Sequence, residues 1–248
     1  MAAPVLILDE TDSTNAEARR RAEAGEVGPL WIAARRQTAG RGRRGRKWES
    51  ENGNLASTLL LLTRKSPADA AQLTFAASLA VADLLDRYVP AALVTIKWPN
   101  DVLLDGRKTS GILIESGPAP SGGLWMAVGI GVNLGQTPGD TERPATCMAE
   151  HLSQGVASAP TVDEAAKALA ETFGVWLDRW TTLGFQPILD AWIARTPGLH
   201  GPCTARLTNE TLTGTADGVE ADGSLRLKLP DGSLRVISAG DVFFGEAA

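Results

Sequence analysis

The segment from Gly40 to Trp48 carries the clearest chemical signal in this chain, reading Gly-Arg-Gly-Arg-Arg-Gly-Arg-Lys-Trp. Closely spaced glycines let a backbone approach a ligand, and arginines present planar forks to carboxylate and phosphate oxygens. Seven of the 24 basic residues fall between Arg35 and Lys47, although the net charge of the chain is −5. The segment predicts a loop that holds two anionic groups together, and a flexible solvated loop is the alternative. It lacks the Gly-Lys-Ser/Thr ending of a Walker loop.

A second polar segment, Lys97-Trp-Pro-Asn-Asp101, directly follows an apolar stretch that predicts a strand. The pair Asp105-Gly106 is a hairpin signal, so the returning strand brings Lys108 near Asn100 and Asp101. A lysine at that place can neutralise a phosphate. Taken separately, these residues are also typical turn formers.

A third segment, Gly129-Ile-Gly-Val-Asn133, ends another apolar stretch. It does not fit a dinucleotide-binding fingerprint, because Gly135 comes one position late and no helix pattern follows. Glycines within a strand let a ligand or another backbone come close, and Asn133 is then placed to hydrogen-bond a base.

Composition narrows the class of protein. The 248 residues are 44% hydrophobic and 21% charged, which is typical of a soluble globular protein, and we expect no stretch that approaches a membrane span. We expect a cytoplasmic protein, because the N-terminus has no secretory pattern. With Cys147, Cys203, His151 and His200 alone, we expect free thiols and no metal site built by the protein itself. Basic charge confined to one loop argues against a general nucleic-acid binder.

The hydrophobic pattern predicts a mixed sheet with few helices, an α+β fold. Strands are expected at residues 5–8, 30–34, 55–62, 93–96, 109–115 and 124–132. Helices are expected from N-cap candidates at residues 11–15 to Gly25, from Ser66-Pro67 to about Tyr88, from a capping box at Thr161–Glu164 to about Leu183, and from Pro187 to Arg195.

Past Thr196-Pro197-Gly198 the sequence changes to short β-rich segments, with turn signals at Asp222-Gly223 and Asp231-Gly232. Strands are expected at residues 204–207, 211–216, 225–229, 234–237 and 242–244. We therefore predict a catalytic domain over residues 1–197, in which helices cover the sheet, and a small β-barrel domain over residues 198–248.

Four motifs in one order resemble those of the biotin protein ligase family: Thr11-Asp-Ser-Thr-Asn15, Gln37-Thr-Ala-Gly-Arg-Gly-Arg-Arg-Gly-Arg-Lys-Trp48, Lys97-Trp-Pro-Asn-Asp101 with Lys108, and Gly129-Ile-Gly-Val-Asn133. The terminal β-rich segment resembles the Src-homology-3-like barrel of that family. The resemblance implies an ATP- and Mg²⁺-dependent enzyme that forms biotinyl-5′-AMP and then biotinylates a lysine of a biotin carboxyl carrier domain, the partner belonging to a biotin-dependent carboxylase. It also implies a short form that lacks the family's N-terminal helix-turn-helix domain and binds no DNA.

The same resemblance implies roles for individual residues. Lys108 and Arg43 would be catalytic. Biotin would contact Ser13, Thr14, Asn15, Gln37, Gly40, Arg41, Trp48, Lys108 and Gly111. The nucleotide would contact Arg43, Arg46, Asn100 and Asn133, and Asp101 would be a weak ligand of Mg²⁺ bound with ATP.

Two departures from the family pattern stand out. Thr109-Ser110-Gly111 follows Lys108 where the family often has Leu-Ala-Gly, so we expect a slightly more polar wall there. Ala145-Thr-Cys-Met148 resembles the family's Ala-Thr-Ser-Leu with an altered apolar contact, which weakens assignments on the adenine side.

Activation as an adenylate needs no protein nucleophile, and cations must bring the biotin carboxylate and the α-phosphate together. We expect the C-terminal barrel to contribute to transfer rather than to adenylation, because it supplies none of the four motifs. A lipoyl or octanoyl ligase of related architecture is the nearest alternative, and a nucleic-acid-binding protein that uses the Arg/Gly loop is a distant one. The protein would associate with no membrane, and a homodimer is one option for its oligomeric state.

Overall fold

The computed structural model describes residues 3–49, 52–139, 141 and 144–245. Within these residues the first part of the chain contains strands and helices in mixed order: β1 (Val5–Thr11), α1 (Thr14–Glu23), β2 (Leu30–Gln37), η1 (Arg43–Gly45), β3 (Leu55–Thr63), α2 (Pro67–Ala71), α3 (Leu73–Leu85), η2 (Ala91–Leu93), β4 (Val94–Lys97), β5 (Asp101–Leu104), β6 (Arg107–Pro118), β7 (Leu124–Val132), η3 (Met148–Glu150), α4 (Val162–Leu183) and α5 (Gln186–Ala194). The last part contains β8 (Pro202–Arg206), β9 (Thr211–Val219), β10 (Leu225–Lys228), β11 (Leu234–Ile237) and β12 (Asp241–Phe244).

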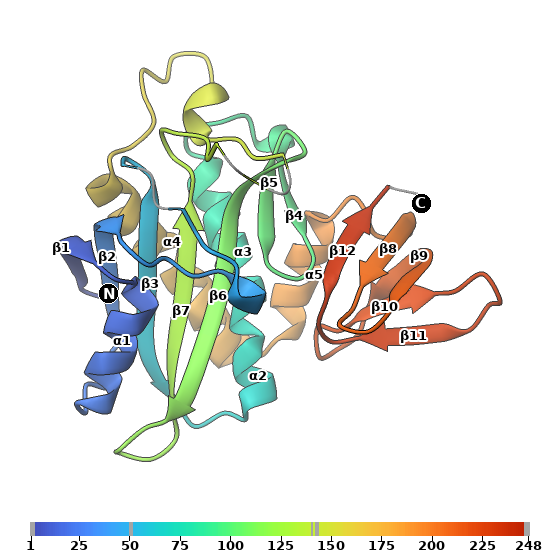
Figure 1. Cartoon of the computed structure of the whole chain (residues 1–248), viewed down its shortest axis with the longest axis horizontal. Helices are drawn as coiled ribbons and strands as arrows, with labels where there is room; N and C mark the ends of the chain where they lie inside the picture. The colour runs from blue at the N-terminus through green and yellow to red at the C-terminus, as the bar shows by residue number, and fades with distance from the viewer. Residues whose placement is uncertain (1–2, 50–51, 140, 142–143, 246–248) are drawn as a thin grey trace.

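The larger sheet has the strand order β1-β2-β3-β7-β6-β5-β4 (Figure 1). Strands β1 and β2 pair in parallel, and the pairs from β2 onward are antiparallel. The mixed sheet predicted from the sequence is therefore confirmed. The tight turn between β5 and β6 uses Asp105 and Gly106, which have φ values of 53° and 70° and form the expected hairpin.

The two faces of this sheet are covered by different helices, because successive side chains of a strand point to opposite sides. Trp31 packs in the core that includes α3 and α4, while the next residue, Ile32, packs with Ala18 and Ala22 of α1. Helices α3, α4 and α5 thus form one layer, and α1 covers only part of the other face (Figure 1). The uncovered remainder of the α1 face is available for a ligand.

The second and third predicted helices begin with the expected caps, whereas the Ser13 side chain at the start of α1 makes no capping hydrogen bond. Ser66 accepts a hydrogen bond from the Asp69 amide, and Thr161 and Glu164 form the predicted capping box of α4. The helix expected up to Tyr88 is instead divided at Gln72 into α2 and α3.

The expectation that no stretch approaches a membrane span is wrong for residues Pro67–Leu85. By length and composition alone it is apolar enough to cross a membrane, with a mean hydropathy of 1.3 over a window of which 67% is buried. That burial against the sheet and α4 identifies it as a core helix.

The smaller sheet is antiparallel, with the order β11-β10-β9-β8-β12. In the described part of the chain β11 and β12 are its outer strands and are not paired with each other. Its buried side chains, among them Cys203, Ala205 and Val242, join the core of the larger sheet, and the Trp98 indole donates a hydrogen bond to the Gly223 carbonyl over 2.9 Å. A domain boundary at residue 197 stays a prediction, and it falls between α5 and β8.

Candidate functional site

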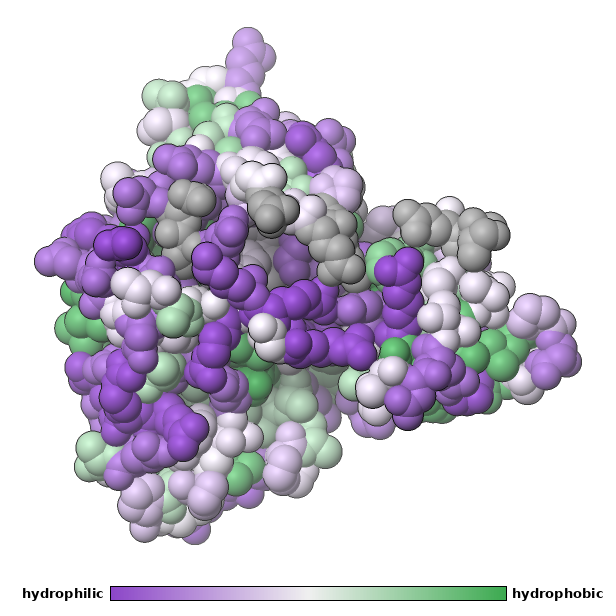
Figure 2. All heavy atoms as spheres, in the orientation of Figure 1, coloured by the Kyte–Doolittle hydropathy of each residue, from purple (hydrophilic) through white to green (hydrophobic). Residues whose placement is uncertain are grey.

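A cavity of about 510 Å³ opens on the α1 face of the large sheet. The segment Gly40–Trp48, called here the basic loop, crosses strands β7 and β6 above it (Figure 1). Hydrophilic residues gather across the middle of this face, towards the C-terminal sheet (Figure 2). Residues from all four sequence motifs line the cavity, so segments far apart in the chain meet there.

One end of the cavity is a buried pocket of uncharged polar side chains. Ser13, Thr14 and Asn15 lie at the start of α1 and are each 4% exposed. The Gln37 side-chain oxygen accepts a hydrogen bond from the Thr14 amide over 2.8 Å. The Thr58 hydroxyl of β3 lies 2.8 Å from the Thr14 hydroxyl and 2.6 Å from the Asn15 side-chain oxygen. We call this group the ring pocket, and its polar atoms are held in fixed directions by one another.

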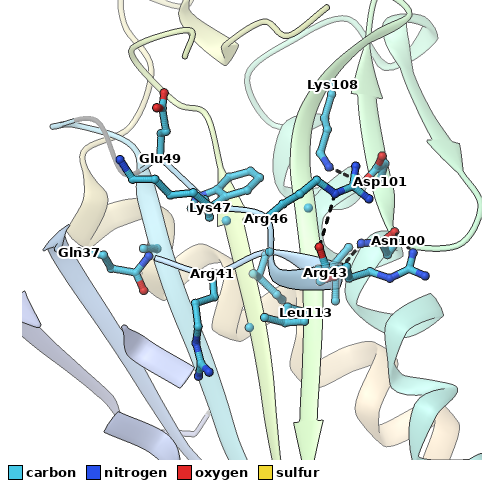
Figure 3. Close-up of a pocket in the computed structure, with 18 of the residues that line it drawn as sticks. Gln37, Arg41, Arg43, Arg46, Lys47, Glu49, Asn100, Asp101, Lys108 and Leu113 are labelled. Atoms are coloured by element: carbon cyan, nitrogen blue, oxygen red, sulfur yellow. Dashed lines mark hydrogen bonds and ion pairs between the residues drawn. The ribbon is translucent and has the colours of Figure 1, made fainter. Parts of the chain in front are cut away.

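Glu115 of β6 joins the ring pocket to the basic loop. Its Oε2 atom accepts hydrogen bonds from the Asn15 side-chain nitrogen over 2.8 Å and from the Arg41 guanidinium over 3.1 Å. The Asn15 nitrogen also donates to the Leu113 carbonyl over 3.2 Å. The Arg41 side chain therefore points away from Lys108 and Asp101 (Figure 3).

The basic loop is a small hairpin with internal hydrogen bonds. The Gly42 amide donates to the Arg46 carbonyl over 2.7 Å, and the Trp48 amide donates to the Gly40 carbonyl over 3.0 Å. Its tip turns through Arg44 and Gly45 in the left-handed region, with φ values of 58° and 74°. The hairpin lays the arginines of the loop along the cavity.

The floor under the hairpin requires glycine. A Cβ added at Gly131 would lie 2.3 Å from the Trp48 ring, and one added at Gly129 would lie 2.3 Å from the Asn15 side chain. Both distances are far below van der Waals contact, so these two positions of β7 admit the ring pocket and the Trp48 ring only because they have no side chain. The glycines of the third motif thus serve close approach, as predicted.

The opposite end of the cavity, called here the reaction end, combines cations with carboxylate and amide groups (Figure 3). The Lys108 Nζ atom lies 2.6 Å from Asp101 Oδ1, as the hairpin predicted. Arg43 donates to the Asn100 side-chain oxygen over 2.7 Å. Burial lowers the pKa of the Arg43 guanidinium, while the charges of Asp241 and Asp101 act in the opposite direction. Lys108 and Arg43 therefore face the same space from different elements.

The C-terminal sheet contributes directly to this end, although it carries none of the four motifs. Asp241, the first residue of β12, lines the cavity and forms ion pairs with Arg46 at 2.8 Å and Arg44 at 3.4 Å. The neighbouring Gly240 carbonyl accepts from Arg43 over 3.4 Å. The basic loop is therefore tied to the C-terminal sheet.

Asn133 lies at the end of β7, beside the segment that includes Ala145. Its side-chain nitrogen donates to the Thr146 carbonyl over 3.0 Å, whereas its buried side-chain oxygen has no hydrogen-bond partner in the described structure. Buried polar atoms are rarely left unpaired in native proteins. Because Asn133 also lines the cavity, this oxygen is suited to a donor from a ligand.

The structure brings most of the predicted site residues into one cavity. The lining includes Ser13, Thr14, Asn15, Gln37, Arg41, Arg43, Arg46, Trp48, Asn100, Asp101, Lys108, Gly111 and Asn133. Gly40 is different: it lies behind the wall, where a Cβ would come within 2.4 Å of the Trp48 carbonyl oxygen. Gly40 therefore positions Trp48.

The expectation of a more polar wall after Lys108 is wrong. Thr109 and Ser110 are both fully buried and do not line the cavity, whereas Lys108 and Gly111 do. The pairing of β5 with β6 shifts between Val102 and Leu103, which leaves Thr109 as an extra residue. This bulge breaks the alternation of side chains and re-aims Lys108.

Sequence reasoning missed three contributors to the site: Thr58, Glu115 and Asp241. Each acts through a contact with a residue more than 40 positions away in the chain, and none lies in a recognisable motif. Arg35 and Arg36, counted with the basic cluster, point elsewhere and pair with Asp163 and Glu10.

The geometry is suited to joining two anions. A neutral polar group fits the ring pocket, an apolar chain fits beside Trp48, and the reaction end offers cations to a carboxylate and a phosphate. Within the described residues no cluster of three or more His, Cys, Asp or Glu side chains is arranged to hold a metal ion.

Comparison with known proteins supports the family resemblance that the four motifs indicate. Residues 8–134 match the biotin/lipoate A/B protein ligase family, and residues 202–245 match the biotin protein ligase C terminal domain. A biotin–[acetyl-CoA-carboxylase] ligase of Paracoccus denitrificans is 43% identical over 96% of this chain and 100% of its own length. The bifunctional ligase/repressor BirA of Bacillus subtilis is 33% identical over 95% of this chain and 72% of its length.

Solved structures share the fold. The biotin protein ligase of Aquifex aeolicus in complex with biotin and ATP superposes with a TM-score of 0.79 at 24% identity, covering 98% of this chain and 99% of the other. The biotin protein ligase of Leishmania major in complex with biotin gives a TM-score of 0.63 at 26% identity, covering 95% and 98%.

Proposed function

This chain belongs to the biotin protein ligase family, and we infer that it is an ATP-dependent ligase that forms biotinyl-5′-AMP and then transfers biotin to a lysine of a carrier protein. One observation carries this function in the structure. A single cavity combines a buried uncharged polar pocket with Lys108 and Arg43 at its other end. Biotin has this polarity, because its ureido ring is neutral and polar and its valeryl chain ends in a carboxylate.

We propose that the ureido ring occupies the ring pocket formed by Ser13, Thr14, Asn15 and Gln37. Trp48 would then lie along the valeryl chain, and the carboxylate would reach Lys108. The pocket supports this orientation because its polar atoms are buried and fixed before a ligand arrives, which reduces the entropy lost on binding.

In the first half-reaction, an oxygen of the biotin carboxylate attacks the α-phosphorus of ATP, and pyrophosphate leaves. Two anions repel each other on this path, so the role we propose for Lys108 and Arg43 is to hold the carboxylate and the α-phosphate together. Arg46 and Asn100 are proposed to contact the phosphates. Asn133 is proposed to accept a hydrogen bond from the exocyclic amine of adenine, which would satisfy its unpaired oxygen.

Mg²⁺ bound with the triphosphate is part of the proposal, and the donor set at the reaction end fits it to a limited degree. Mg²⁺ usually binds through one or two carboxylates together with substrate phosphates. Asp101 is a carboxylate on the cavity wall, although Lys108 lies 2.6 Å from it. Asp101 would hold the ion, which would supply charge neutralisation for the phosphates.

In the second half-reaction, the neutral amine of the carrier lysine attacks the carbonyl carbon of the mixed anhydride, and AMP leaves with the bonding electrons. The amine loses a proton as the amide forms. Positioning by protein docking suffices here, because the anhydride is already activated. We propose that the carrier is the biotin carboxyl carrier domain of a carboxylase, in line with the name of the Paracoccus relative.

A lipoyl or octanoyl ligase remains the alternative from the same family, and the ring pocket argues against it. An octanoyl chain or a dithiolane ring would place apolar surface against this buried polar pocket and offer it no hydrogen bond, which is costly. A nucleic-acid-binding role has less support, because Arg44 and Arg46 are paired with Asp241 rather than spread over an open basic face. The cytoplasmic location and the homodimer stay predictions.

Pyrophosphate release tests the function directly. With ATP and Mg²⁺, we expect release to depend on biotin and not on lipoate or octanoate. Transfer is then measured as biotin bound to an isolated carrier domain, with a carrier whose target lysine is replaced by arginine as the control. Release with lipoate but not with biotin would overturn the proposal.

A further inference from the structure

Glu115 stands out among the residues that the proposed chemistry does not use. It lies on β6 with a half-buried side chain, outside the four motifs, and one of its oxygens contacts both Asn15 and Arg41. Asn15 belongs to the ring pocket, and Arg41 begins the basic loop. One carboxylate thus connects the two parts that must enclose biotin.

Glu115 and the Leu113 carbonyl are both acceptors that orient the Asn15 amide, and Glu115 makes the shorter contact of the two. An ionised carboxylate can only accept hydrogen bonds, so the Asn15 nitrogen must face it. The second hydrogen of that nitrogen is directed to the Leu113 carbonyl. The Asn15 oxygen is consequently turned towards Thr58, whose hydroxyl lies 2.6 Å away.

The orientation of the Asn15 amide in turn determines the hydrogen-bond directions of Thr58 and Thr14. The single hydroxyl hydrogen of Thr58 is committed to the Asn15 oxygen, so Thr58 can only accept from the Thr14 hydroxyl, 2.8 Å away. The Thr14 hydrogen is then directed to Thr58 or to Gln37, and a lone pair of the Thr14 oxygen is left for a ligand. A ureido N–H group needs an acceptor of this kind.

We propose that Glu115 is a positioning residue for biotin: its carboxylate sets the hydrogen-bond direction along Asn15, Thr58 and Thr14 and anchors the basic loop through Arg41. The inference rests on the function proposed above. It assigns Glu115 to ring recognition and loop closure, and not to the reaction end, which Lys108 and Arg43 occupy.

Substitution Glu115→Gln tests the inference, because it keeps the shape of the side chain but removes the charge and lets the Asn15 amide turn over. Charge-assisted hydrogen bonds are strong enough that the Kd of biotin should rise about 10-fold. The KM of ATP and kcat at saturating biotin should change by less than about threefold, because Arg43 of the basic loop keeps its own contact with Asn100 at the reaction end. Titration calorimetry and initial rates of pyrophosphate release measure these constants.

The matched control is Glu10→Gln. Glu10 also pairs with an arginine, Arg36 at 2.7 Å, but it does not line the cavity. This variant should bind biotin within about twofold of the wild type. If Glu115→Gln does not fold, Glu115→Asp keeps the charge on a shorter side chain, and we expect it to raise the Kd of biotin about threefold with the KM of ATP unchanged.

A double-mutant cycle separates positioning from a general structural effect. In an Asn15→Ala background, Glu115→Gln should weaken biotin binding by less than about threefold further, because the residue it orients is gone. A Kd unchanged by Glu115→Gln, equal losses for biotin and ATP, or a full further 10-fold loss in the Asn15→Ala background would each overturn the inference. Biotin-dependent pyrophosphate release by the wild type tests the proposed function separately.

Discussion

The two ends of the cavity are built on different physical principles. The ring pocket consists of neutral polar side chains. Ser13, Thr14 and Asn15 are almost fully buried, and Thr14 is hydrogen-bonded to Gln37 and Thr58. The reaction end consists of charged groups with more solvent exposure, and the Lys108 side chain retains 30% of its accessible surface. Recognition of a neutral ring favours fixed dipoles, whereas activation of a carboxylate needs charges that can exchange partners.

The ion pairs of the reaction end show which partners its cations have within the protein. Lys108 is held by Asp101, and Arg46 by Asp241, so each cation already faces a carboxylate. The same cations are proposed to bind substrate carboxylate and phosphate oxygens. Substitutions at the reaction end should therefore change rates, and substitutions around the ring pocket should change biotin affinity.

The largest effect is expected at Lys108. Lys108→Gln should slow biotinyl-adenylate formation about 10- to 100-fold, because a charge-assisted contact that strengthens in the transition state is lost. Biotin binding should weaken by less than about threefold. Lys108→Arg keeps the charge in a different shape and should retain more activity. Single-turnover rates beside biotin titrations measure both quantities. Lys65→Gln, which removes a lysine packed over Trp180, is the control.

Near wild-type rates for Lys108→Gln would show that Lys108 only belongs to a turn. Another cation, with Arg43 as the first candidate, would then have to hold the two anions.

A smaller effect, on biotin affinity rather than on rate, is expected from substitution of Gly131. In Gly131→Ala, the added Cβ would lie 2.3 Å from the Trp48 ring, so the ring must move away from the biotin path. We expect the Kd of biotin to rise about 10-fold with little change in the KM of ATP, because a packing wall is displaced rather than a charge. Gly135→Ala serves as the control, because its Cβ would meet only the Gly53 carbonyl oxygen at 3.8 Å, an ordinary contact. Unchanged biotin affinity would place Trp48 outside the biotin site.

Asp241→Asn should have a milder effect, which is expected on both adenylate formation and the stability of the basic loop. It removes the carboxylate that pairs with Arg44 and Arg46, and exposed pairs contribute modestly. We expect adenylate formation to slow about threefold and the amides of residues 42–47 to exchange faster with solvent. Hydrogen exchange with and without biotin measures the second effect. Unaltered exchange in this variant would show that the basic loop is held without the C-terminal sheet.

The smallest change should be seen in Ser110→Ala, which leaves the site intact. The Ser110 hydroxyl is fully buried and has no hydrogen-bond partner in the described structure. Removing an unsatisfied buried polar group should raise the free energy of unfolding by about 1 kcal/mol without changing activity. Ser78→Ala is the matched control, because Ser78 is equally buried but donates to the Phe75 carbonyl and should lose stability. Urea unfolding compares the two, and a destabilised Ser110→Ala would reveal a partner for the hydroxyl.

Local patterns in the sequence predicted most of the elements of the fold. The Asp105-Gly106 turn, the Thr161–Glu164 capping box and the apolar positions of α3 each depend on neighbours within a few residues. The division of α2 from α3 at Gln72 was missed, because no proline or glycine marks it. The four motifs likewise predicted which segments meet at the cavity.

Long-range contacts and side-chain directions could not be predicted in the same way. The bulge at Thr109 depends on the pairing of β5 with β6, so the sequence alone suggested a more polar wall after Lys108. The link from Asp241 to Arg46 spans 195 positions, and Glu115 reaches Arg41 across 74. Such contacts follow from how the sheets pack, which no local pattern specifies.

The ties at the two sides of the basic loop have a consequence for the lifetime of the intermediate. A mixed anhydride is readily hydrolysed, and an enzyme that must wait for a carrier protein wastes ATP if water reaches its intermediate. Glu115 holds the loop at Arg41, and Asp241 holds it at Arg44 and Arg46. A loop fastened on both sides would retain the adenylate and keep water away from it until the carrier arrives, and we therefore expect the two carboxylates to raise the fraction of ATP that yields a biotinylated lysine.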